Sequence, residues 1–315
     1  MTNLISIDDL SDNQLFSIVE KAKFFFNNNI LKQHHNIENA NNIVNGKILI
    51  NLFFENSTRT KTSFQIAAHN LGYKVVNIDL NSSSIKKGES IIDTIKTINA
   101  MNPNVVVVRH NSSGFARFIS QYLNCLVINA GDGTNEHPTQ SLVDLTNISL
   151  HKSDLHNLKI AICGDVFHSR VARSNIKLLH RLSSKFALEI NIASPATLLN
   201  YDYQKWLDEK YQIKSFTDMV PAIENADCIM LLRIQQERMS SCYISSHNEY
   251  FRYFGLDENK IKLAKPDVII MHPGPINRDV EIASNLADNL KYSTILDQVA
   301  LGVATRQAIL TILDN

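Results

Sequence analysis

Short apolar stretches of β-strand type alternate with helical patterns along most of the chain, and this alternation limits the possible folds more than any other feature. In the first half, the strand-like stretches lie at residues 47–54, 73–79, 104–109 and 125–129, with helical spacing between them. Apolar strands separated by helices are typical of parallel sheets that are covered on both faces. The first half is therefore predicted to form an α/β layered structure.

A second series of the same kind begins after the polar break HKSDLHN at residues 151–157. Its strand-like stretches are LKIAICG, LEINIAS, DCIMLLR and DVIIMH, and helices are expected near residues 171–182, 197–210, 218–226 and 246–254. A helix that starts at Pro138 joins the two series, since proline suits the first position of a helix. The sequence thus predicts two doubly wound parallel-sheet α/β domains joined by a helix.

The two ends of the chain are also predicted to be helical. Ser11 and Gln14 form a capping-box pattern in front of apolar residues at helical spacing, namely Leu15, Ile18, Val19, Ala22 and Phe25. The Asn- and His-rich residues 27–45 are expected to form a loop. A last helix, from about Leu296 to Leu313, has no strand after it and is expected to pack back on the first domain.

Composition argues against several classes of partner. Lys+Arg and Asp+Glu number 31 each, so nothing favours nucleic acid or a charged membrane surface. No apolar run approaches the roughly 20 residues that cross a bilayer, and the N-terminus lacks the apolar core of a signal peptide. The 4 cysteines are widely scattered, so no metal site is expected. They are expected to be reduced thiols in the protein core. The cytoplasm is the expected compartment, with no membrane or nucleic-acid partner.

Unusual polar sequences follow many of the predicted strands. They are ENSTRT, Arg109 with His110, GDGTNEHPTQ, GDVFHSR, RIQQER and HPGPINRD. Open parallel sheets bind ligands beyond the carboxyl ends of their strands, so these segments predict a ligand cleft. Charged loops that serve only solubility are the alternative.

The segment ENSTRT is predicted to bind phosphate. Ser57, Thr58 and Thr60 offer hydroxyl donors, and Arg59 offers a planar fork at the start of a helix, where backbone N–H groups and the dipole favour anions. The alternative is that Ser57 or Thr58 only caps the helix and Arg59 is a surface residue. No GxxxxGK[ST] or GxGxxG pattern occurs, which favours a small phosphate compound held by side chains.

The roles of two further segments do not follow from their residues alone. In SSSIKKGES, residues 82–90, the pair Lys86 and Lys87 reads as a solvated turn before a helix capped by Ser90. In HPTQ, His137 stands before a helix start, where its imidazole could donate to a carbonyl oxygen and Gln140 would lie on the first turn. A structural histidine is the commoner case.

Taken together and in order, these motifs resemble the aspartate/ornithine carbamoyltransferase family over essentially the whole chain. The motifs are FFENSTRT, SSSIKKGES, VVVVRH, GDGTNEHPTQ, GDVFHSR, RIQQER and HPGPINRDVEI. The resemblance implies a carbamoyl-phosphate domain at residues 1–142, to which the helix at 293–315 returns, and an aspartate domain at residues 143–292. It implies an active site between the domains and a homotrimer whose neighbouring chains share each site.

The resemblance also implies roles for individual residues. Those expected to bind carbamoyl phosphate are Ser57, Thr58, Arg59, Thr60, Arg109, His137, Gln140, Pro273 and Gly274, with Ser83 and Lys87 donated by a neighbouring chain. Those expected to bind the amino acid are Lys87, Arg170, Arg233 and Gln235. The residues implied to be catalytic are Arg59, Thr60, Arg109, His137 and Lys87. No cofactor and no metal are expected.

The implied reaction is direct attack of the α-amino group of L-aspartate on carbamoyl phosphate, through a tetrahedral intermediate, in pyrimidine biosynthesis. Thr60, Arg109 and His137 would stabilise the carbonyl oxygen as an oxyanion hole does. His272-Pro273-Gly274-Pro275 stands where ornithine-specific members typically carry HCLP, which favours aspartate as the acceptor. Another amino-acid acceptor and a non-catalytic scaffolding member are the alternatives; a regulatory chain or a dihydroorotase partner is left open.

Overall fold

The computed structural model describes residues 2–34, 46–78, 88–235, 244 and 246–314. The chain forms two compact units, one of residues 1–146 with 299–315 and one of residues 147–298. The predicted boundary at 142/143 and the observed one at 146/147 both fall within helix α5 (Pro138–His151). Each unit is described by itself.

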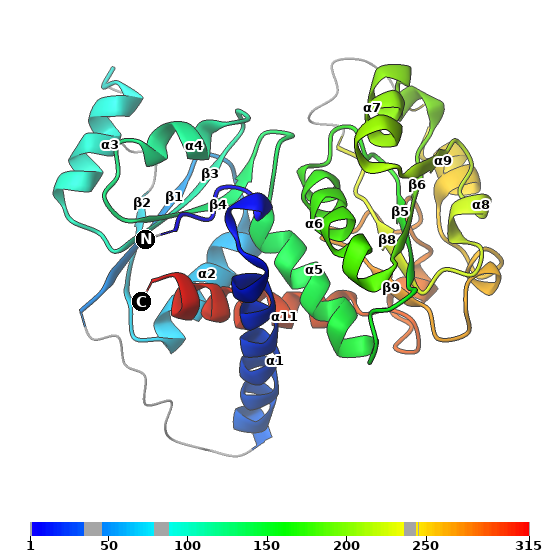
Figure 1. The fold of residues 1–315 in the computed structure, drawn as a ribbon, viewed down its shortest axis with the longest axis horizontal. Coiled ribbons are helices and arrows are strands. Elements are labelled where there is room, and N and C mark those ends of the chain that lie inside the picture. The colour runs from blue at the N-terminus through cyan, green and yellow to red at the C-terminus, as the bar shows by residue number, and fades with distance from the viewer. Residues whose placement is uncertain (1, 35–45, 79–87, 236–243, 245, 315) are drawn as a thin grey trace. The chain divides into compact units, whose positions relative to one another are not determined.

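The first unit is built on a four-stranded parallel sheet (Figure 1). Its strands are β1 (Ile48–Phe53), β2 (Lys74–Ile78), β3 (Val105–His110) and β4 (Leu126–Asp132), in the spatial order β2-β1-β3-β4. The order reverses direction at β1 and β3, because the chain moves outward from β1 to β2 and then returns to the other side of β1. This reversal is the mark of a doubly wound sheet.

Helices cover both faces of this sheet. Helices α3 (Ile91–Ala100) and α4 (Phe115–Ser120) pack on one face, where Ile50, Leu52 and Val106 contribute to one buried apolar cluster. Helix α2 (Thr58–Asn70) packs against β1 and β2, and its Phe64 is fully buried. The strands read as continuous apolar runs because both faces are covered.

The second unit contains a five-stranded parallel sheet in the order β7-β6-β5-β8-β9. Its strands are β5 (Lys159–Cys163), β6 (Glu189–Ala193), β7 (Lys214–Phe216), β8 (Cys228–Leu231) and β9 (Ile269–Met271). Here the order reverses at β5 and β8. The predicted fold class of two doubly wound parallel-sheet domains is therefore confirmed.

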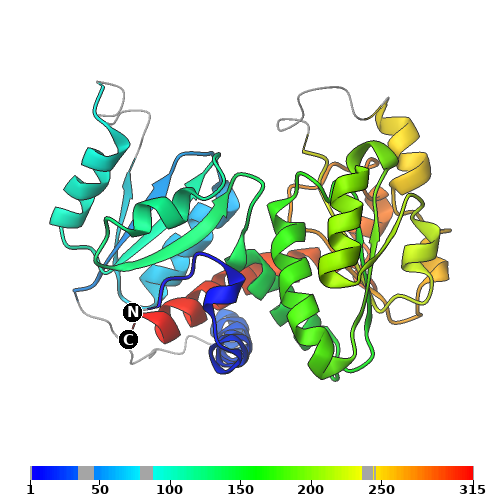
Figure 2. The ribbon, with the colours of Figure 1, turned by 45° about the horizontal axis from the view of Figure 1, so that its top comes forward.

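Helices again cover both faces of the second sheet (Figure 2). Helices α6 (Arg170–Phe186) and α7 (Tyr201–Tyr211) pack on the face that presents Ile160, Ile162 and Met230. Helices α8 (Val220–Ile223), α9 (His247–Phe254) and α10 (Ser284–Ala287) pack on the other face, as does the short turn η5 (Ile261–Leu263). The short turn η3 (Ala196–Leu198) follows β6.

Some local predictions were wrong. Helix α1 spans Asp12–His34, so the predicted loop at 27–45 begins later than expected, and residues 35–45 lie outside the described part of the chain. The capping box of Ser11 and Gln14 is confirmed, whereas Phe26 rather than Phe25 is buried. Strand β7 was not predicted, because the three residues KSF carry too little apolar pattern to identify an edge strand.

The final helix, α11 (Ile295–Leu313), returns to the first unit from residue 299 onward, as predicted. The guanidinium of Arg306 lies 5.1 Å from the ring centre of Phe64 on α2. By length and composition α11 would also suffice to cross a membrane, although no apolar run of that length was expected from the sequence. However, 61% of its most apolar 18-residue stretch is buried inside the protein. A buried core helix satisfies the same criterion.

Three of the four cysteines lie in the described part of the chain, and all three are buried: Cys125, Cys163 and Cys228. Burial raises the pKa of Cys163 and of Cys228 to about 12. A thiol with so high a pKa stays protonated and unreactive, which is the behaviour of a core residue.

The end of α11 is held by a buried acid, and this contact predicts a measurable share of stability. Asp314, 2% exposed, accepts a hydrogen bond of 2.6 Å from the Tyr73 hydroxyl and lies 3.1 Å from the Lys47 ammonium. We expect Asp314→Asn to lower the free energy of unfolding by roughly 1–2 kcal/mol, because charge-assisted hydrogen bonds become neutral ones. Urea denaturation measures this change.

The control is Glu20→Gln, which removes an exposed carboxylate 3.0 Å from Lys23 on α1 and should leave stability nearly unchanged. Equal stability of the Asp314→Asn variant and the unmodified protein would contradict the assigned role of this contact.

Candidate active site

In both sheets, several predicted site residues lie at the ends of the strands at which the spatial order reverses, or directly after them. The segment carrying Ser57–Thr60 follows β1, and Arg109 is the next-to-last residue of β3, where it pairs with Phe53 of β1. In the second unit, Arg170 follows β5 and Arg233 follows β8. Ligands of doubly wound sheets bind in the crevice at this switch point. The two sets of residues thus occupy the ligand position of their own sheets.

The first helical turn of α2 differs from those of the other helices that begin after a serine or asparagine cap residue. Ser57 is the N-cap residue of α2, yet its side chain makes no capping hydrogen bond. In contrast, Ser90, Ser169, Asn200 and Ser246 each cap their helices with a side-chain oxygen. The alternative that Ser57 only caps its helix is therefore not supported, and its hydroxyl can serve a ligand.

The neighbouring hydroxyl and guanidinium groups differ in exposure. Thr60 is 7% exposed, whereas Thr58 and Arg59 are exposed on the first turn of α2. The first N–H groups of a helix lack intrahelical partners, and the helix dipole places partial positive charge there. These groups offer the donors that the predicted phosphate site requires, and binding of an anion there stays a prediction.

Arg109 is oriented by an acid from the same edge of the sheet. Its Nε lies 3.0 Å from an oxygen of Glu55, and both side chains are largely shielded from solvent. The backbone of Phe54 donates to the Arg109 carbonyl, which joins the end of β1 to the end of β3. Glu55 therefore fixes Arg109 beside the start of α2.

The adjacent His110 has a structural role. Its ring stacks on Phe115 with centroids 3.7 Å apart, and Nδ1 accepts a hydrogen bond from the backbone of Ser112. Burial lowers the pKa of His110, so the imidazole remains neutral. This agrees with the sequence-based choice of His137 over the other histidines.

His137 and Gln140 lie at the start of α5, directly beyond β4. His137 is 4% exposed, and its Nδ1 lies 3.3 Å from the hydroxyl oxygen of Thr139. The amide of Gln140 donates to Asp144 one turn further along, at 2.9 Å. Asp144 is itself buried, and its charge favours the buried guanidinium of Arg306 on α11. The C-terminal helix thus supports Gln140 through Asp144.

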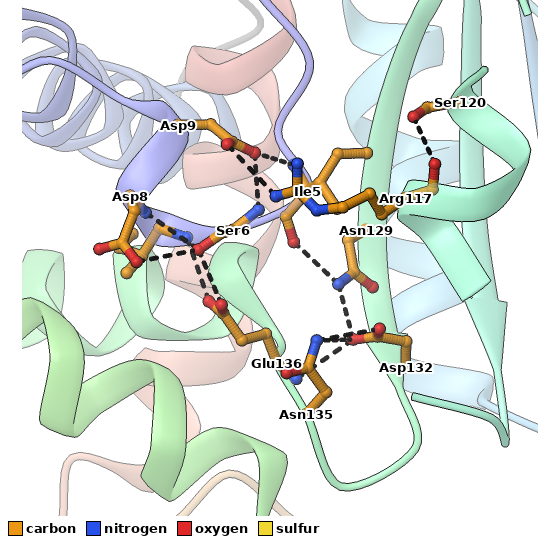
Figure 3. A network of polar contacts seen from close by, with 11 residues as sticks. Ile5, Ser6, Asp8, Asp9, Arg117, Ser120, Asn129, Asp132, Asn135 and Glu136 are labelled. Carbon is orange, nitrogen blue, oxygen red and sulfur yellow. Dashed lines mark hydrogen bonds and ion pairs between the residues drawn. The ribbon is translucent and has the colours of Figure 1, made fainter. Parts of the chain in front are cut away.

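The turn that leads into α5 is held by a buried carboxylate (Figure 3). Asp132, 1% exposed, accepts hydrogen bonds from the backbone of Gly114 and Glu136 and from the side chains of Asn129 and Asn135. A charge buried to this extent is tolerated only when it is fully hydrogen-bonded. The position of His137 therefore follows from a rigid turn.

In the second unit, the segment after β8 is held by a buried acid from the loop after β5. Asp165 is fully buried, and its carboxylate accepts from the backbone of Gln235 at 3.2 Å. It also lies 2.9 Å from Nδ1 of His168. Arg170, 3% exposed, occupies the first position of α6, after the capping residue Ser169. Asp165 thereby ties Gln235 to the loop that carries Arg170.

A second buried acid holds the same segment from the other side. Glu281, 1% exposed, accepts from the backbone of Ile234 at 3.1 Å and from both the backbone and the amide of Asn277. Burial raises the pKa of Glu281, and the nearby charge of Arg233 opposes that rise. Arg233 therefore lies in a segment fixed through two consecutive peptide N–H groups, those of Ile234 and Gln235.

The turn after β9 is close to this acid as well. His272 lies with Nε2 3.9 Å from Glu281, and its Nδ1 accepts from the backbone of Gly274 at 2.8 Å. Pro273 and Gly274 are half-buried at the edge of the sheet. The second unit thus brings together Arg170, Arg233, Gln235 and the turn at 272–274. Ser83 and Lys87 lie outside the described residues.

Comparison with known families identifies the chain. Residues 2–149 match the aspartate/ornithine carbamoyltransferase carbamoyl-P binding domain, and residues 156–313 match the Asp/Orn binding domain of the same family. The chain belongs to the aspartate/ornithine carbamoyltransferase family. The family resemblance predicted from the motifs is confirmed.

Individual relatives in the family agree with the match. The chain is 46% identical to an aspartate carbamoyltransferase catalytic subunit of Pelagibacter ubique, over 98% of this chain and 95% of the relative. It is similar to aspartate transcarbamoylase from Trypanosoma cruzi in complex with N-(phosphonacetyl)-L-aspartic acid, with a TM-score of 0.86, 28% identity and coverage of 98% and 94%.

The backbone fold is also shared with ornithine carbamoyltransferase from Pyrococcus furiosus, with a TM-score of 0.82 at 24% identity, over 98% of this chain and 96% of that one. The fold of this family is therefore common to members named for different amino acids. The choice of acceptor has to come from side chains.

Sequence reasoning missed the acids that hold the site residues in place. Asp132, Asp165 and Glu281 stand inside the motifs GDGTNEHPTQ, GDVFHSR and HPGPINRDVEI, yet each is buried and hydrogen-bonded to backbone groups. The sequence signal that could have revealed them is an acidic residue inside a family motif to which no ligand had been assigned. In the described part of the chain, no group of three or more His, Cys, Asp or Glu residues could hold a metal ion.

The uncapped start of α2 gives a direct test of the anion site. We expect Ser57→Ala to weaken binding of inorganic phosphate roughly tenfold, because a hydrogen bond to a charged group is lost, and to leave unfolding almost unchanged. Asn200 does cap its helix, α7, by accepting from Tyr203 at 2.8 Å. Asn200→Ala should therefore cost about 1 kcal/mol of stability and leave phosphate binding intact.

Titration calorimetry with inorganic phosphate and urea denaturation measure the two effects. If Ser57→Ala destabilised the protein as Asn200→Ala does and left phosphate affinity unchanged, Ser57 would be an ordinary cap.

Proposed function

We propose that the chain transfers the carbamoyl group of carbamoyl phosphate to the α-amino group of L-aspartate, giving N-carbamoyl-L-aspartate and phosphate. The observation that carries this proposal is the chemical difference between the two switch points. Hydroxyl and guanidinium donors suited to a phosphate and a carbonyl oxygen lie after β1 and at the end of β3, whereas Arg170 and Arg233, suited to carboxylates, follow β5 and β8.

The chemistry at the first switch point is electrostatic. The amino group attacks the carbamoyl carbon, negative charge develops on the carbonyl oxygen, and the bond to phosphate then breaks while the amine proton leaves with the phosphate. Thr60, Arg109 and His137 stabilise that oxygen, and loss of one such donor costs roughly 10²–10³ in rate. Arg59 and the start of α2 stabilise the departing phosphate. No covalent enzyme adduct is needed.

The second switch point selects the acceptor. Guanidinium groups pair with carboxylates in a fixed, bidentate geometry. Aspartate has two carboxylates and ornithine has one with a cationic side chain, so Arg170 together with Arg233 favours aspartate. Gln235 and the carbonyls of Pro273 and Gly274 supply further polar contacts. The T. cruzi structure in complex with N-(phosphonacetyl)-L-aspartic acid supports the same acceptor.

The proposal includes an assembly and a cellular setting. We infer a homotrimer in the cytoplasm in which Ser83 and Lys87 of one chain complete the site of its neighbour, and a role in pyrimidine biosynthesis. The support is the match of SSSIKKGES to the family pattern and the catalytic-subunit names of the relatives. A regulatory chain or a dihydroorotase is a possible further partner of such a trimer.

A carbamoyl-transfer assay tests the reaction directly. Purified protein with carbamoyl phosphate should form carbamoyl-aspartate, and turnover with ornithine in the parallel assay should be at least a hundredfold slower. The reason is the cost of placing a cationic side chain beside Arg233. Faster turnover with ornithine would reverse the assigned acceptor, and no turnover with either would favour a non-catalytic member.

Subunit mixing tests the shared site. Arg59→Ala and Lys87→Ala should each be nearly inactive alone, because each removes a charge from every site. Mixed and exchanged trimers should regain activity, since some sites then receive Arg59 from one chain and Lys87 from another. Absence of recovery after exchange has been verified by mass spectrometry would contradict a site shared between chains.

A further inference from the structure

The side chain directly before His137 connects the proposed carbamoyl-phosphate site to the N-terminal segment of the chain. Glu136 is 2% exposed, and both of its oxygens accept hydrogen bonds from that segment (Figure 3). Oε1 accepts from the Ser6 hydroxyl at 2.7 Å, and Oε2 accepts from the Ile7 backbone N–H at 3.1 Å. Residues about 130 positions apart in the sequence are thus joined by a buried ionic hydrogen-bond pair.

The N-terminal segment is itself firmly fixed. Leu4 exchanges backbone hydrogen bonds with the edge strand β4, through Val127 and Asn129. The amide of Asn129 donates to the Ile5 carbonyl at 2.9 Å. The carboxylate of Asp9 accepts from the N–H groups of Ile5 and Ser6 at 2.8 Å each. Ser6 and Ile7 therefore present their donors to Glu136 from a rigid platform.

Glu136 is also held through its backbone on the opposite side. Its N–H donates to the buried carboxylate of Asp132 at 3.1 Å, and its carbonyl accepts from the Asp132 N–H at 3.1 Å. With backbone and side chain both fixed, the Cα of the next residue, His137, has little freedom. Burying a carboxylate carries a desolvation penalty, so a buried and paired carboxylate often adds little net stability to the fold. Its contribution here is therefore to place the imidazole of the next residue.

We propose that Glu136 is a positioning residue for His137, and that Ser6 and Ile7 form part of the apparatus of the carbamoyl-phosphate site. This inference rests on the proposed function, in which His137 donates to the carbonyl oxygen. Because both oxygens of Glu136 accept from Ser6 and Ile7, it acts by fixing the turn from which the imidazole projects.

The test compares Glu136→Ala, Glu136→Gln and the control Asp314→Asn. The control alters another buried carboxylate of the same unit, which bonds to Tyr73 and Lys47 away from the site. Glu136→Ala should lower kcat at least tenfold, part of the loss expected for an oxyanion-hole donor, with the KM for aspartate changed less than twofold. Asp314→Asn should lower stability while leaving kcat unchanged.

Glu136→Gln should retain kcat within about threefold. Its amide oxygen can accept from the Ile7 N–H, and its amide nitrogen can donate to the Ser6 hydroxyl, which both donates and accepts. Adding Ser6→Ala to Glu136→Ala should produce no further loss of kcat, because both changes remove the same contact.

The imidazole resonances of His137 in ¹⁵N-histidine-labelled protein, assigned with His137→Asn, report ring placement without turnover. They should shift in Glu136→Ala and stay in place in Asp314→Asn. If Glu136→Ala matched the control in both kcat and these resonances, the positioning role would be overturned. If the unmodified protein had no carbamoyl-transfer activity but the resonances still moved, the proposed function would fall and the positioning role would stand.

Discussion

Parallel pairing of strands is the constraint on which the rest of the structure depends. Because every strand of a parallel sheet points the same way, all of its carboxyl ends emerge at one edge. Reversal of the spatial order at β1/β3 and at β5/β8 then sends the flanking crossovers in opposite directions and opens a crevice at that edge. The hydroxyl, guanidinium and imidazole groups of the site are distant in sequence, and this geometry gathers them within each unit.

Strand ends alone do not hold side chains in place, and the protein relies on buried carboxylates for that purpose. Asp132, Glu136, Asp165 and Glu281 are each 2% exposed or less. Asp132, Asp165 and Glu281 each accept a backbone N–H from a segment that bears a proposed ligand-binding residue, whereas Glu136 accepts that of Ile7 in the N-terminal segment. Acids suit this task because a carboxylate accepts several hydrogen bonds at once and each is charge-assisted. The arginines proposed to bind anionic substrates are thus carried by segments that buried carboxylates hold in place.

Much of the fold could be predicted from the sequence because its signals are local. Apolar runs bounded by polar turns identified most strands, and the family motifs supplied the predicted site residues, which the structure places at strand ends and helix starts. What escaped prediction depends on contacts between distant segments. Strand β7 owes its existence to pairing with β6. The role of Glu136 depends on Ser6, and that of Asp144 on Arg306; neither partner stands near in sequence. The uncapped state of Ser57 also could not be read from a serine that precedes a helix.

The return of α11 to the first unit has a consequence for how the protein comes into being. Residues 147–298 form the second unit, and they are synthesised before residues 299–313, which the first unit requires for its core. Until those last residues are made, the first unit lacks Arg306 and the contacts of Asp314 with Tyr73 and Lys47. The unit that begins first along the chain, which carries the proposed phosphate site, thus receives its last segment only after every residue of the second unit has been made.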